Sequence, residues 1–377
     1  MRIGFVLFSW FPQGGLQQDL VKVVRACQGR ADLSIHCLDW EGEKVPGVPT
    51  EVFRPRRFTS RFTKVGLREA FADHVLHEVK PAVDLVVGFN RLPGLDYYFA
   101  ADSCFAWRMR QRPWWQALTP RARQYLRFEQ AVFVNQSSTT ALLLSPLQRE
   151  QYMQCYHTPS SRLIDLPPGI DRKHCAGVDA ASLREGFRTE FNVGPDHLAV
   201  LQIGSSFVTK GLDRSLQALA ALPPALKDKT HFFLMGRDKH LASWQRRAAE
   251  AGLRGLHFLG SEHSVPRCMQ GADVLLHPSL HESAGMVILE AVVAGLPVLT
   301  TANCGYAWHV QQAAAGLVCP EPFDQRHLNG LLASMLTADR SEWRQNGIDY
   351  GQTHNLYDMP TVAADILLNH RLNRRAG

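Results

Sequence analysis

Residues 274–290 run Val274-Leu275-Leu276-His277-Pro278-Ser279-Leu280-His281-Glu282-Ser283-Ala284-Gly285-Met286-Val287-Ile288-Leu289-Glu290. The apolar start predicts a buried β-strand that ends at Pro278, because a short uninterrupted apolar run suits a strand covered on both faces. The small residues after Glu282 predict a loop, and the apolar residues from Met286 onward predict a helix that ends at Gly295. Strand, loop and helix in this order indicate an α/β fold with a functional loop at the end of a strand.

Two glutamates occupy this stretch, one in the loop and one within the helix. The start of a helix offers free backbone N–H groups and the positive end of the helix dipole, which together suit a phosphate. The helix from Ala284 to Glu290 spans roughly 9 Å. Glu282 and Glu290 could therefore hold hydroxyl groups at the two ends of a sugar–diphosphate–ribose ligand. The alternative is a loop acid and an exposed helix acid, but the apolar helix predicts that Glu290 is buried and needs a partner.

The length of the chain, 377 residues, favours two domains over one. Strand-like and helix-like runs alternate in both halves, and Pro167-Pro168-Gly169 interrupts the pattern between them. This alternation predicts two Rossmann-like, doubly wound α/β domains that face a cleft. We expect an N-terminal domain over residues 1–167, a C-terminal domain over 168–357, and a helical segment over 358–377 that could return to the first domain.

The expected strands follow from short apolar runs bounded by turn residues. In the first half they are Arg2–Phe8, Leu33–Leu38, Glu51–Phe53, Val83–Gly88, Thr140–Leu144 and Arg162–Leu166. In the second half they are His197–Ile203, His231–Met235, Leu256–Leu259, Asp273–His277, Pro297–Thr301 and Gly316–Cys319. The stretch after Gly88, with Asn90, Pro93 and Gly94, predicts a loop beyond a strand end.

Composition excludes several classes of protein. No apolar run reaches the roughly 18 residues that a membrane-spanning helix needs, and the apolar start at Met1 is better explained by a first buried strand than by a signal sequence. The eight cysteines show no Cys-x-x-Cys spacing. We therefore expect reduced thiols in the cytoplasm and no zinc site.

The positive charge is concentrated in the first half of the chain. The formal net charge is +6; residues 1–170 hold 21 Lys/Arg and 15 Asp/Glu, whereas residues 171–377 hold 20 of each. Within the first half, the segment Phe105–Phe128 interleaves arginines with aromatic residues and holds no acidic residue. We interpret this segment as a docking surface for an anionic membrane; the alternatives are a helix pair with a buried aromatic core and a nucleic-acid groove. The predicted membrane-docking residues are Arg108, Arg110, Arg112, Trp114, Trp115, Arg121 and Arg123.

Glycine-rich turns follow the first strand of each half. Gly14-Gly15 permits positive φ angles and close approach of a ligand to the backbone, with Asp19 behind it in the expected helix. The alternative is an ordinary tight turn in which Asp19 complements the helix dipole. In the second half, Lys210 lies in the loop after a strand, where a lysine could neutralise a diphosphate leaving group. A solvated loop lysine is the alternative.

Asp102 follows the apolar run that ends at Ala101, in a region where strand ends and loops are expected. Functional residues concentrate in such loops. An N-cap of the following helix is an equally good explanation of this aspartate.

Together these residues resemble family 4 of the retaining, metal-independent glycosyltransferases, which have the GT-B fold. The resemblance is carried by Gly14-Gly15, Lys210-Gly211 and the Glu282/Glu290 pair. Within that family the chain resembles the lipopolysaccharide core glucosyltransferase I group. The strings that support this are Phe11-Pro12-x-Gly14-Gly15-Leu16-Gln17-x-Asp19, Trp40-Glu41-Gly42, Gly88-Phe89-Asn90-x-x-Pro93-Gly94-Leu95-Asp96, Phe99-Ala100-Ala101-Asp102, Pro167-Pro168-Gly169-Ile170 and Cys304-Gly305-Tyr306-Ala307.

The resemblance implies a role for each matching position. Glu282 would hold hydroxyls of the donor sugar, Glu290 would hold the ribose, and Lys210 would stabilise the diphosphate as it leaves. Asp102 stands where a histidine often lies near the transferred sugar in this family, and the backbone of Gly15 would approach the phosphate. The implied catalytic residues are Asp102, Lys210 and Glu282. The implied donor-binding residues are Gly14, Gly15, Asp19, Arg172, Ser205, Lys210, Glu282, Ala284, Gly285, Met286, Val287 and Glu290.

Two departures from the family pattern remove positive charge near the diphosphate. Ser205 stands where many members carry arginine, and Thr209 stands where core glucosyltransferases carry an arginine before the lysine. Arg172 is the candidate for partial compensation.

The expected activity is transfer of a hexose, glucose in the first instance, from a UDP-sugar to the lipopolysaccharide core with retention of configuration and without a metal or other cofactor. The expected partners are the UDP-sugar, the lipopolysaccharide core acceptor and an anionic membrane surface on the cytoplasmic face of a bacterial inner membrane, with no nucleic acid. The alternatives are a sugar-nucleotide-binding scaffold of a core-assembly complex, and a nucleotide-sugar epimerase or sugar phosphorylase on the same fold.

Overall fold

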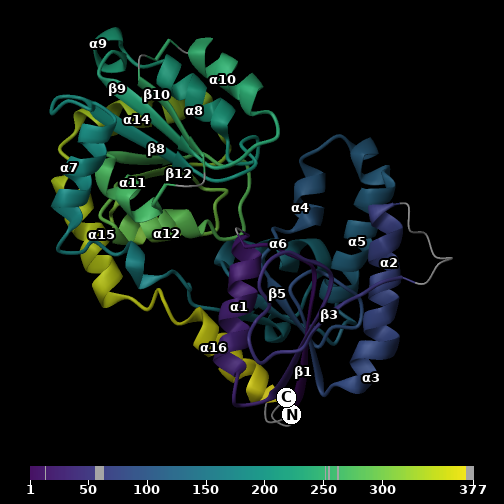
Figure 1. Cartoon of the computed structure of the whole chain (residues 1–377). Coiled ribbons are helices and arrows are strands. Elements are labelled where there is room, and N and C mark those ends of the chain that lie inside the picture. The colour runs from purple at the N-terminus through teal and green to yellow at the C-terminus, as the bar shows by residue number, and fades with distance from the viewer. Residues whose placement is uncertain (13, 56–62, 251, 254, 261–262, 371–377) are drawn as a thin grey trace. The chain divides into compact units, whose positions relative to one another are not determined.

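The computed structural model describes residues 1–12, 14–55, 63–250, 252–253, 255–260 and 263–370. The chain separates into two compact units (Figure 1). Unit 1 comprises Met1–Gly169 together with the C-terminal residues from Tyr357, and unit 2 comprises Ile170–Leu356. Each unit is built on a parallel β-sheet covered by helices, which confirms the predicted α/β class with two Rossmann-like domains.

The sheet of unit 1 has the strand order β3-β2-β1-β4-β5-β6-β7, and all its pairs are parallel. Its first strand, β1, is buried from Ile3 to Leu7 because helices cover both faces of the sheet. The strands are β1 (Arg2–Trp10), β2 (Asp32–Trp40), β3 (Thr50–Val52), β4 (Leu85–Gly88), β5 (Tyr97–Ala100), β6 (Thr140–Leu143) and β7 (Leu163–Asp165).

The helices of unit 1 flank this sheet. Figure 1 shows α1 and α16 on one side, and α2 and α3 on the other. They are α1 (Gly15–Cys27), α2 (Lys64–His74) continued by a π-helical turn (Val75–Val79) and α3 (Lys80–Ala82), α4 (Phe105–Arg110), a 3-10 turn (Trp114–Leu118), α5 (Pro120–Phe133), α6 (Pro146–Tyr156), a 3-10 turn (Ser160–Arg162) and α16 (Met359–Leu368).

The C-terminal helix α16 packs beside α1, so the chain returns to its first unit. Arg30 and Asp365 form an ion pair of 2.7 Å between them, but both side chains are about half exposed, so the pair stabilises little. The burial of Ala363, Ala364 and Leu367 stabilises this packing more, because it removes apolar surface from water. Residues 371–377 of the predicted helical segment lie outside the described residues.

Unit 2 has the strand order β10-β9-β8-β11-β12-β13, again with parallel pairs. Figure 1 shows α8 and α10 on one side of this sheet, and α11 and α12 on the other. The strands are β8 (Leu198–Ile203), β9 (Thr230–Met235), β10 (Gly255–Gly260), β11 (Val274–His277), β12 (Val298–Thr301) and β13 (Gly316–Cys319). The helices are a 3-10 turn, η4 (Arg172–His174), α7 (Ala180–Glu190), α8 (Leu212–Ala220), α9 (Pro224–Lys227), α10 (Leu241–Glu250), α11 (Val265–Gly271), α12 (Met286–Val293), α13 (Ala307–Gln312), α14 (Gln325–Thr337) and α15 (Ser341–Thr353).

One strand was not predicted. Tyr97–Ala100 forms β5, which pairs with β4 and β6, whereas the predicted strands did not include this apolar run after the loop at Gly88–Gly94. A run of four residues is too short to show the alternation of apolar and polar residues that identifies a strand. Its burial depends on contacts with strands that are far away in the sequence. Asp102 follows β5 directly but is not a helix cap, because the N-cap of α4 is Cys104.

None of the helices in the described part of the chain combines the length and apolarity that crossing a bilayer requires.

Candidate active site

Both sheets contain a point where the strand order reverses. In unit 1 it lies between β1 and β4, and in unit 2 between β8 and β11. Ligands of open α/β sheets bind outside the carboxyl ends of the strands at such points, because the loops diverge there and leave space. The loops after three of these strands, β1, β8 and β11, carry Gly14, Lys210 and Glu282.

Lys210 and Glu282 meet at the switch point of unit 2. The Lys210 ammonium donates to Oε1 of Glu282 in a short, partly buried ion pair. Lys210 comes from the loop after β8 and Glu282 from the loop after β11, 72 residues later. The structure therefore brings together the two residues that the sequence assigned to the diphosphate and to the donor sugar.

Backbone contacts fix these two loops against each other. Gly211 has φ +70°, and a Cβ on it would overlap the carbonyl oxygen of Pro278, so only glycine allows this approach. The N–H of Leu280 donates to the carbonyl of Thr209 at 2.9 Å. Lys210 is therefore held beside Glu282 by main-chain packing as well as by charge.

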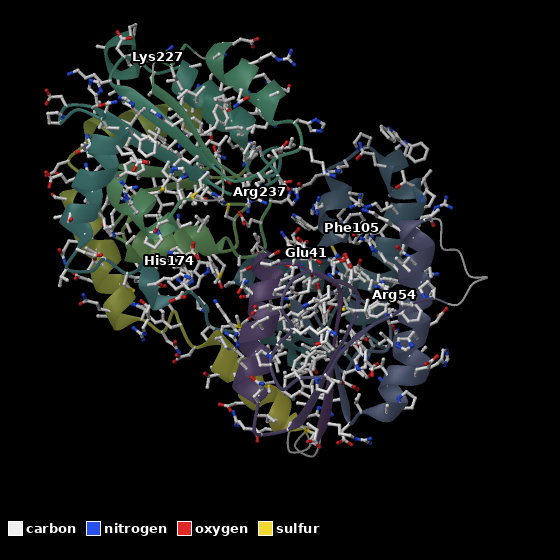
Figure 2. The ribbon with its side chains drawn as sticks, in the orientation of Figure 1. Glu41, Arg54, Phe105, His174, Lys227 and Arg237 are labelled. Atoms are coloured by element: carbon white, nitrogen blue, oxygen red, sulfur yellow. The ribbon has the colours of Figure 1, made fainter. Side chains whose placement is uncertain are left out.

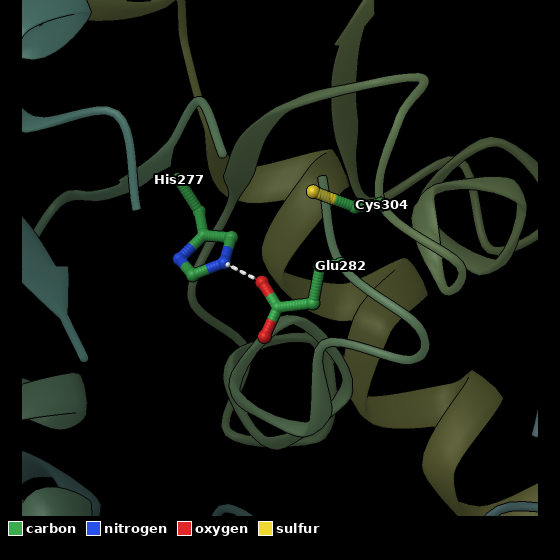
Figure 3. A group of neighbouring side chains, drawn as sticks. All are labelled: His277, Glu282 and Cys304. Atoms are coloured by element: carbon green, nitrogen blue, oxygen red, sulfur yellow. Dashed lines mark hydrogen bonds and ion pairs between the residues drawn. The ribbon is translucent and has the colours of Figure 1, made fainter. Parts of the chain in front are cut away.

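Glu282 has a second set of partners that the sequence reasoning missed. Its Oε2 accepts from Nε2 of His277 at 2.6 Å (Figure 3). The same oxygen accepts from the hydroxyl of Ser279 at 3.2 Å. Both partners are fully buried. His277 ends strand β11 just before Pro278, and a histidine at the carboxyl end of a buried parallel strand was the signal that could have identified it.

These partners decide the ionisation of Glu282. Burial alone would raise the pKa of this carboxyl, but the charges of His277 and Lys210 and their hydrogen bonds outweigh burial and hold the pKa well below its usual range. Glu282 is therefore a carboxylate at any physiological pH. A carboxylate can only accept hydrogen bonds, so it is suited to hydroxyl groups of a ligand.

The helix after Glu282 exposes only one stripe. Helix α12 begins at Met286 after Gly285, which has φ +93°. Ala284, at the end of the loop, is buried, whereas Met286, Val287 and Glu290 are the partly exposed residues of the helix. One stripe that includes the helix start and Glu290 is the arrangement expected for a ligand that lies along the helix.

Glu290 is less buried than predicted. Its side chain keeps 21% of its exposure, and its Oε1 lies 3.6 Å from Nε2 of His174. The apolar neighbours Ile288, Leu289, Ala291, Val292 and Val293 are buried, as the periodicity required, whereas Glu290 lies on the remaining open face. His174 belongs to η4, which packs on α12, and Arg172 starts the same turn with an exposed side chain.

The glycine pair of unit 1 follows β1. Gly14 is the N-cap of α1 with φ −86°, and neither glycine of the pair uses the positive φ that the residue type permits. A Cβ on Gly14 would overlap the flexible end of the Gln17 side chain, whereas nothing lies within 4 Å of a Cβ on Gly15. Asp19 is buried on α1 and lies beyond the first turn, so it does not complement the helix dipole there. The open side of Gly15 remains accessible to a ligand.

Asp102 lies beside a buried arginine–glutamate pair. Arg91 donates to the fully buried Glu129 at 2.5 Å and to the carbonyl of Ser103 at 2.8 Å. A carboxylate oxygen of Asp102 lies 3.7 Å from Arg91, and the Asp102 side chain is half exposed. Arg91 therefore fixes the strand end from which Asp102 projects.

A pocket of about 680 Å³ opens at this switch point of unit 1. Asp102 lies on its wall, together with residues from the ends of β1 and β4 and from α2, α4 and α5. Arg108, Arg112 and Arg121, which were predicted to dock on a membrane, line this pocket. The other four predicted docking residues, Arg110, Trp114, Trp115 and Arg123, do not line it and are exposed, with Trp114 and Trp115 at 74% and 57%.

Comparison with known proteins places the chain in a family. The family described as glycosyl transferases group 1 matches residues 184–353. Over 374 residues the chain is 38% identical to the lipopolysaccharide glucosyltransferase WaaG of Escherichia coli strain K12, an alignment that covers 97% of this chain and 98% of WaaG. This protein is a group 1 glycosyltransferase.

Solved structures agree with this assignment. The crystal structure of WaaG, a glycosyltransferase involved in lipopolysaccharide biosynthesis, matches with a TM-score of 0.88 at 37% identity and covers 97% of this chain and 99% of its own. A crystal structure of HepE from Anabaena in complex with UDP-glucose matches with a TM-score of 0.71 over 99% of this glycosyltransferase and 100% of HepE, but at 17% identity it shows the fold alone. The GT-B fold, the resemblance to the core glucosyltransferase group and the hexosyltransferase class are confirmed.

The glycosyltransferase site has a third neighbour of Glu282 that raises the question of a metal. Atoms of His277, Glu282 and Cys304 lie within 4.8 Å of one another (Figure 3). Burial, and then the charge of Glu282, raises the pKa of the Cys304 thiol to about 11, and both carboxylate oxygens of Glu282 already accept from Lys210 and His277. A metal would have to deprotonate this thiol and compete with a lysine, so the residues fit a hydrogen-bonded network better than a metal centre.

Ser205 and Thr209, which replace arginines of the family pattern, lie in the loop after β8 of the glycosyltransferase. The hydroxyl of Ser205 accepts from the backbone N–H of Arg237 at 3.2 Å. Arg237 is exposed at the carboxyl end of β9, opposite the end marked by Lys227 in Figure 2. Sequence reasoning missed this arginine, which lies next to the position where other members carry one. Thr209 joins the two loops through its backbone carbonyl.

Proposed function

We propose that this enzyme transfers a hexose, glucose in the first instance, from a UDP-sugar to the core oligosaccharide of lipopolysaccharide, with retention of anomeric configuration. The acceptor class comes from WaaG, which is named a lipopolysaccharide glucosyltransferase and matches nearly the whole chain. The observation that carries the donor half is the Lys210–Glu282–His277 network at the switch point of unit 2. HepE, which shares the fold, binds UDP-glucose.

The donor would lie along the start of helix α12. The backbone N–H groups from Ala284 to Val287 and the positive end of the helix dipole would hold the diphosphate. Glu282 would accept from hydroxyls of the sugar, and Glu290 from hydroxyls of the ribose. Lys210, with Arg172 and Arg237 as further cations, would balance the charge that appears on the diphosphate as the bond to the sugar breaks.

The transfer would proceed on one face of the sugar. The bond between the anomeric carbon and the diphosphate oxygen breaks, the acceptor hydroxyl oxygen bonds to the same carbon from the same side, and its proton passes to the departing diphosphate. This route needs no covalent intermediate on Glu282, whose two oxygens are occupied by Lys210 and His277. Lys210 would act on the leaving group in the step where charge develops.

The reaction would need no metal ion. A divalent cation serves to neutralise the leaving diphosphate in other enzymes, and Lys210 with the start of α12 would supply that charge here. Treatment with EDTA should leave the rate of transfer unchanged. Loss of activity that Mn²⁺ or Zn²⁺ restores would contradict this, and would point to the His277, Glu282 and Cys304 cluster.

We place the enzyme on the cytoplasmic face of the inner membrane. Trp114 and Trp115 are exposed beside the exposed Arg110, and exposed aromatic and cationic side chains suit the headgroup region of an anionic bilayer. Replacement of Trp114, Trp115 and Arg110 by serine should reduce cosedimentation with vesicles rich in phosphatidylglycerol. Unchanged cosedimentation would remove membrane docking from the account while leaving transferase activity untouched.

A donor panel tests the proposed function. UDP-glucose, UDP-galactose and UDP-N-acetylhexosamines would each be incubated with a lipopolysaccharide core acceptor lacking its outer hexoses, and the products would be weighed by mass spectrometry. We expect a mass gain of one hexose with UDP-glucose. Binding of the donor without transfer would favour the scaffold, and conversion of UDP-sugar without acceptor would favour an epimerase.

A further inference from the structure

The pocket of unit 1 has a distinctive lining. Besides Arg91, four arginines line it from separate places in the sequence: Arg68 from α2, Arg108 from α4, Arg112 from the turn after α4, and Arg121 from α5. Among the described residues, Asp102 is the one carboxylate on the lining. Arg91 is balanced by the buried Glu129, so the remaining four cations outnumber the acids of the pocket.

None of the four arginines forms an ion pair with a carboxylate in the part of the chain that the structure describes. Arg68 lies over the rings of Phe8 and Tyr125, with its guanidinium carbon 4.9 and 5.1 Å from their centroids. Arg121 lies 5.5 Å from the centroid of Tyr125. Aromatic rings hold a guanidinium in place without neutralising its charge, so these groups keep their capacity to bind an anion.

Arg108 is the arginine whose positive charge is least favoured by its surroundings in the pocket. Its Nε atom is buried and has no hydrogen-bond partner among the described residues. Burial and then the neighbouring charge of Arg112 lower the pKa of Arg108 from its ordinary value. The opposing charges of Asp102 and Glu129 do not offset burial and the neighbouring arginines, so a further anion at this position would be stabilising, which is the arrangement expected of a binding site.

The pocket is also rigid on the side of these arginines. Glu129 accepts from the backbone N–H groups of Phe105 and Ala106, at 2.7 and 2.8 Å, and so anchors the first turn of α4. Figure 2 shows Phe105 in unit 1 at the start of this helix. Because Glu129 is itself held by Arg91, the helix that carries Arg108 is positioned before any ligand arrives.

The size of the pocket indicates a saccharide. Its lining also contains aromatic rings, each of which carries an arginine guanidinium, and amide side chains that already form hydrogen bonds within unit 1: Phe8, Phe105, Tyr125 and Phe128, and Gln17, Asn90, Gln116 and Gln124. A volume of about 680 Å³ suits a short oligosaccharide rather than a single ion. The pocket is partly open, with Arg112 and Arg121 exposed at its rim, and it differs from the surface made by Trp114 and Trp115, which suits a bilayer.

We propose that Arg68, Arg108, Arg112 and Arg121 form an anion subsite that binds a carboxylate or phosphate group on the acceptor saccharide. The inference rests on the proposed function, because it treats the pocket with Asp102 on its wall as the acceptor site. It assigns three of the arginines in the segment Phe105–Phe128 to substrate recognition. Recognition of this acidic group would make the enzyme select acceptors that carry it, since a guanidinium binds a carboxylate or a phosphate in a bidentate manner.

The test uses a soluble, deacylated core acceptor in the absence of membranes. Arg68→Gln and Arg112→Gln should each raise the KM for this acceptor roughly tenfold, the size expected when a hydrogen bond to a charged group is lost, and leave kcat and the affinity for UDP within about twofold. Arg25→Gln is the matched control, because Arg25 is exposed on α1 in the same unit and does not line the pocket. Its KM should be unchanged.

Chemically altered acceptors identify the anionic group. Dephosphorylated and carboxyl-reduced acceptors would be compared with the native one, and the acceptor without the recognised group should show a raised KM with the wild-type enzyme but no further rise with Arg112→Gln. Equal losses by the variant on all three acceptors would overturn the inference. So would an effect of the substitutions that appears only with anionic vesicles, because the ligand would then be a lipid headgroup.

Failure of the proposed function gives a different result. If the wild-type enzyme transfers no hexose, calorimetric titration of the deacylated acceptor still measures the subsite directly. Binding that Arg68→Gln weakens roughly tenfold would support the subsite without the reaction. Equal binding by the wild type and the variant would overturn it.

Discussion

The switch points of the two units differ in how their charges are balanced. In unit 2, Lys210 and His277 each form a hydrogen bond to Glu282, so each oxygen of the carboxylate has a donor. In unit 1, Arg91 is paired with Glu129, but Arg68 and Arg112 reach the pocket without a carboxylate partner among the described residues. The same position in the same kind of sheet therefore holds a matched network in one unit and excess positive charge in the other.

The difference separates two ways to bind a charged substrate. A matched network presents an ionised acid to hydroxyl groups and offers its lysine to a charge that grows during the reaction. A pocket with excess cations is suited to an anion that is present from the start. We infer that the first arrangement serves the donor, whose charge develops as the bond breaks, and the second serves an acidic acceptor.

Replacement of Lys210 should break the unit-2 network most severely. Lys210→Ala should lower the single-turnover rate by a factor of about one hundred or more, the range expected when a group that stabilises a developing anion is lost. The Kd for UDP should change much less. Lys229→Ala is the matched control, since Lys229 is exposed at the opposite end of the same sheet. A near-normal single-turnover rate would refute the assigned role.

Replacement of His277 should have a smaller effect of the same kind. His277→Ala removes a 2.6 Å hydrogen bond to Glu282, so the carboxylate loses its fixed orientation and kcat should fall roughly tenfold. His277→Gln, which retains a donor, should recover part of the loss. If both variants match the wild type in kcat while remaining folded by thermal melting, His277 does not position Glu282.

Glu290 tests the far end of the donor. Glu290→Ala should weaken UDP binding roughly fivefold, because a carboxylate accepting from ribose hydroxyls contributes about one charged hydrogen bond. Calorimetry would measure this against Glu185→Ala, an exposed acid on α7 of the same unit. An unchanged affinity for UDP would contradict the proposal that the ribose binds at the helix face that Glu290 shares with Met286.

The smallest effect concerns stability. Burial lowers the pKa of His309 to about 3 and that of His231 to about 4, with neighbouring histidines adding to the shift. Because the unfolded chain binds these protons near pH 6.5, stability should decline as pH falls below about 6.5, by roughly 1–2 kcal/mol for His309 at pH 5. Denaturant unfolding of His309→Phe should show a shallower decline. An equal decline of stability with falling pH in the wild type and His309→Phe would show that other titratable groups cause the decline.

The sequence predicted the donor side of the enzyme better than the acceptor side. Lys210 and Glu282 lie in the loops that follow buried strands, and the carboxyl ends of parallel strands meet at one edge of a sheet, so their proximity follows from local patterns. His277 was missed as a site residue. The sequence showed that it ends a strand, but not that it forms a hydrogen bond to Glu282. Glu290 was predicted to be buried because the helical repeat of apolar residues identifies the buried face of a helix. It does not show how wide the solvent-exposed face is.

The pocket of unit 1 could not be predicted in the same way. Arg68 and Arg121 come from α2 and α5, and their convergence depends on how those helices pack on the sheet. The unpredicted strand β5 places Asp102 at the same edge as Asn90. A basic and aromatic segment indicates an anionic partner, but only the packing separates arginines that line the pocket from the exposed residues Trp114 and Trp115.

The division of labour between the two switch points is tested most directly by one calorimetric experiment. UDP and the deacylated acceptor would each be titrated into the wild type, Glu290→Ala and Arg112→Gln. We expect Glu290→Ala to weaken only UDP and Arg112→Gln to weaken only the acceptor. If both variants weaken the same ligand, or neither variant weakens either one, the two sites do not divide donor from acceptor.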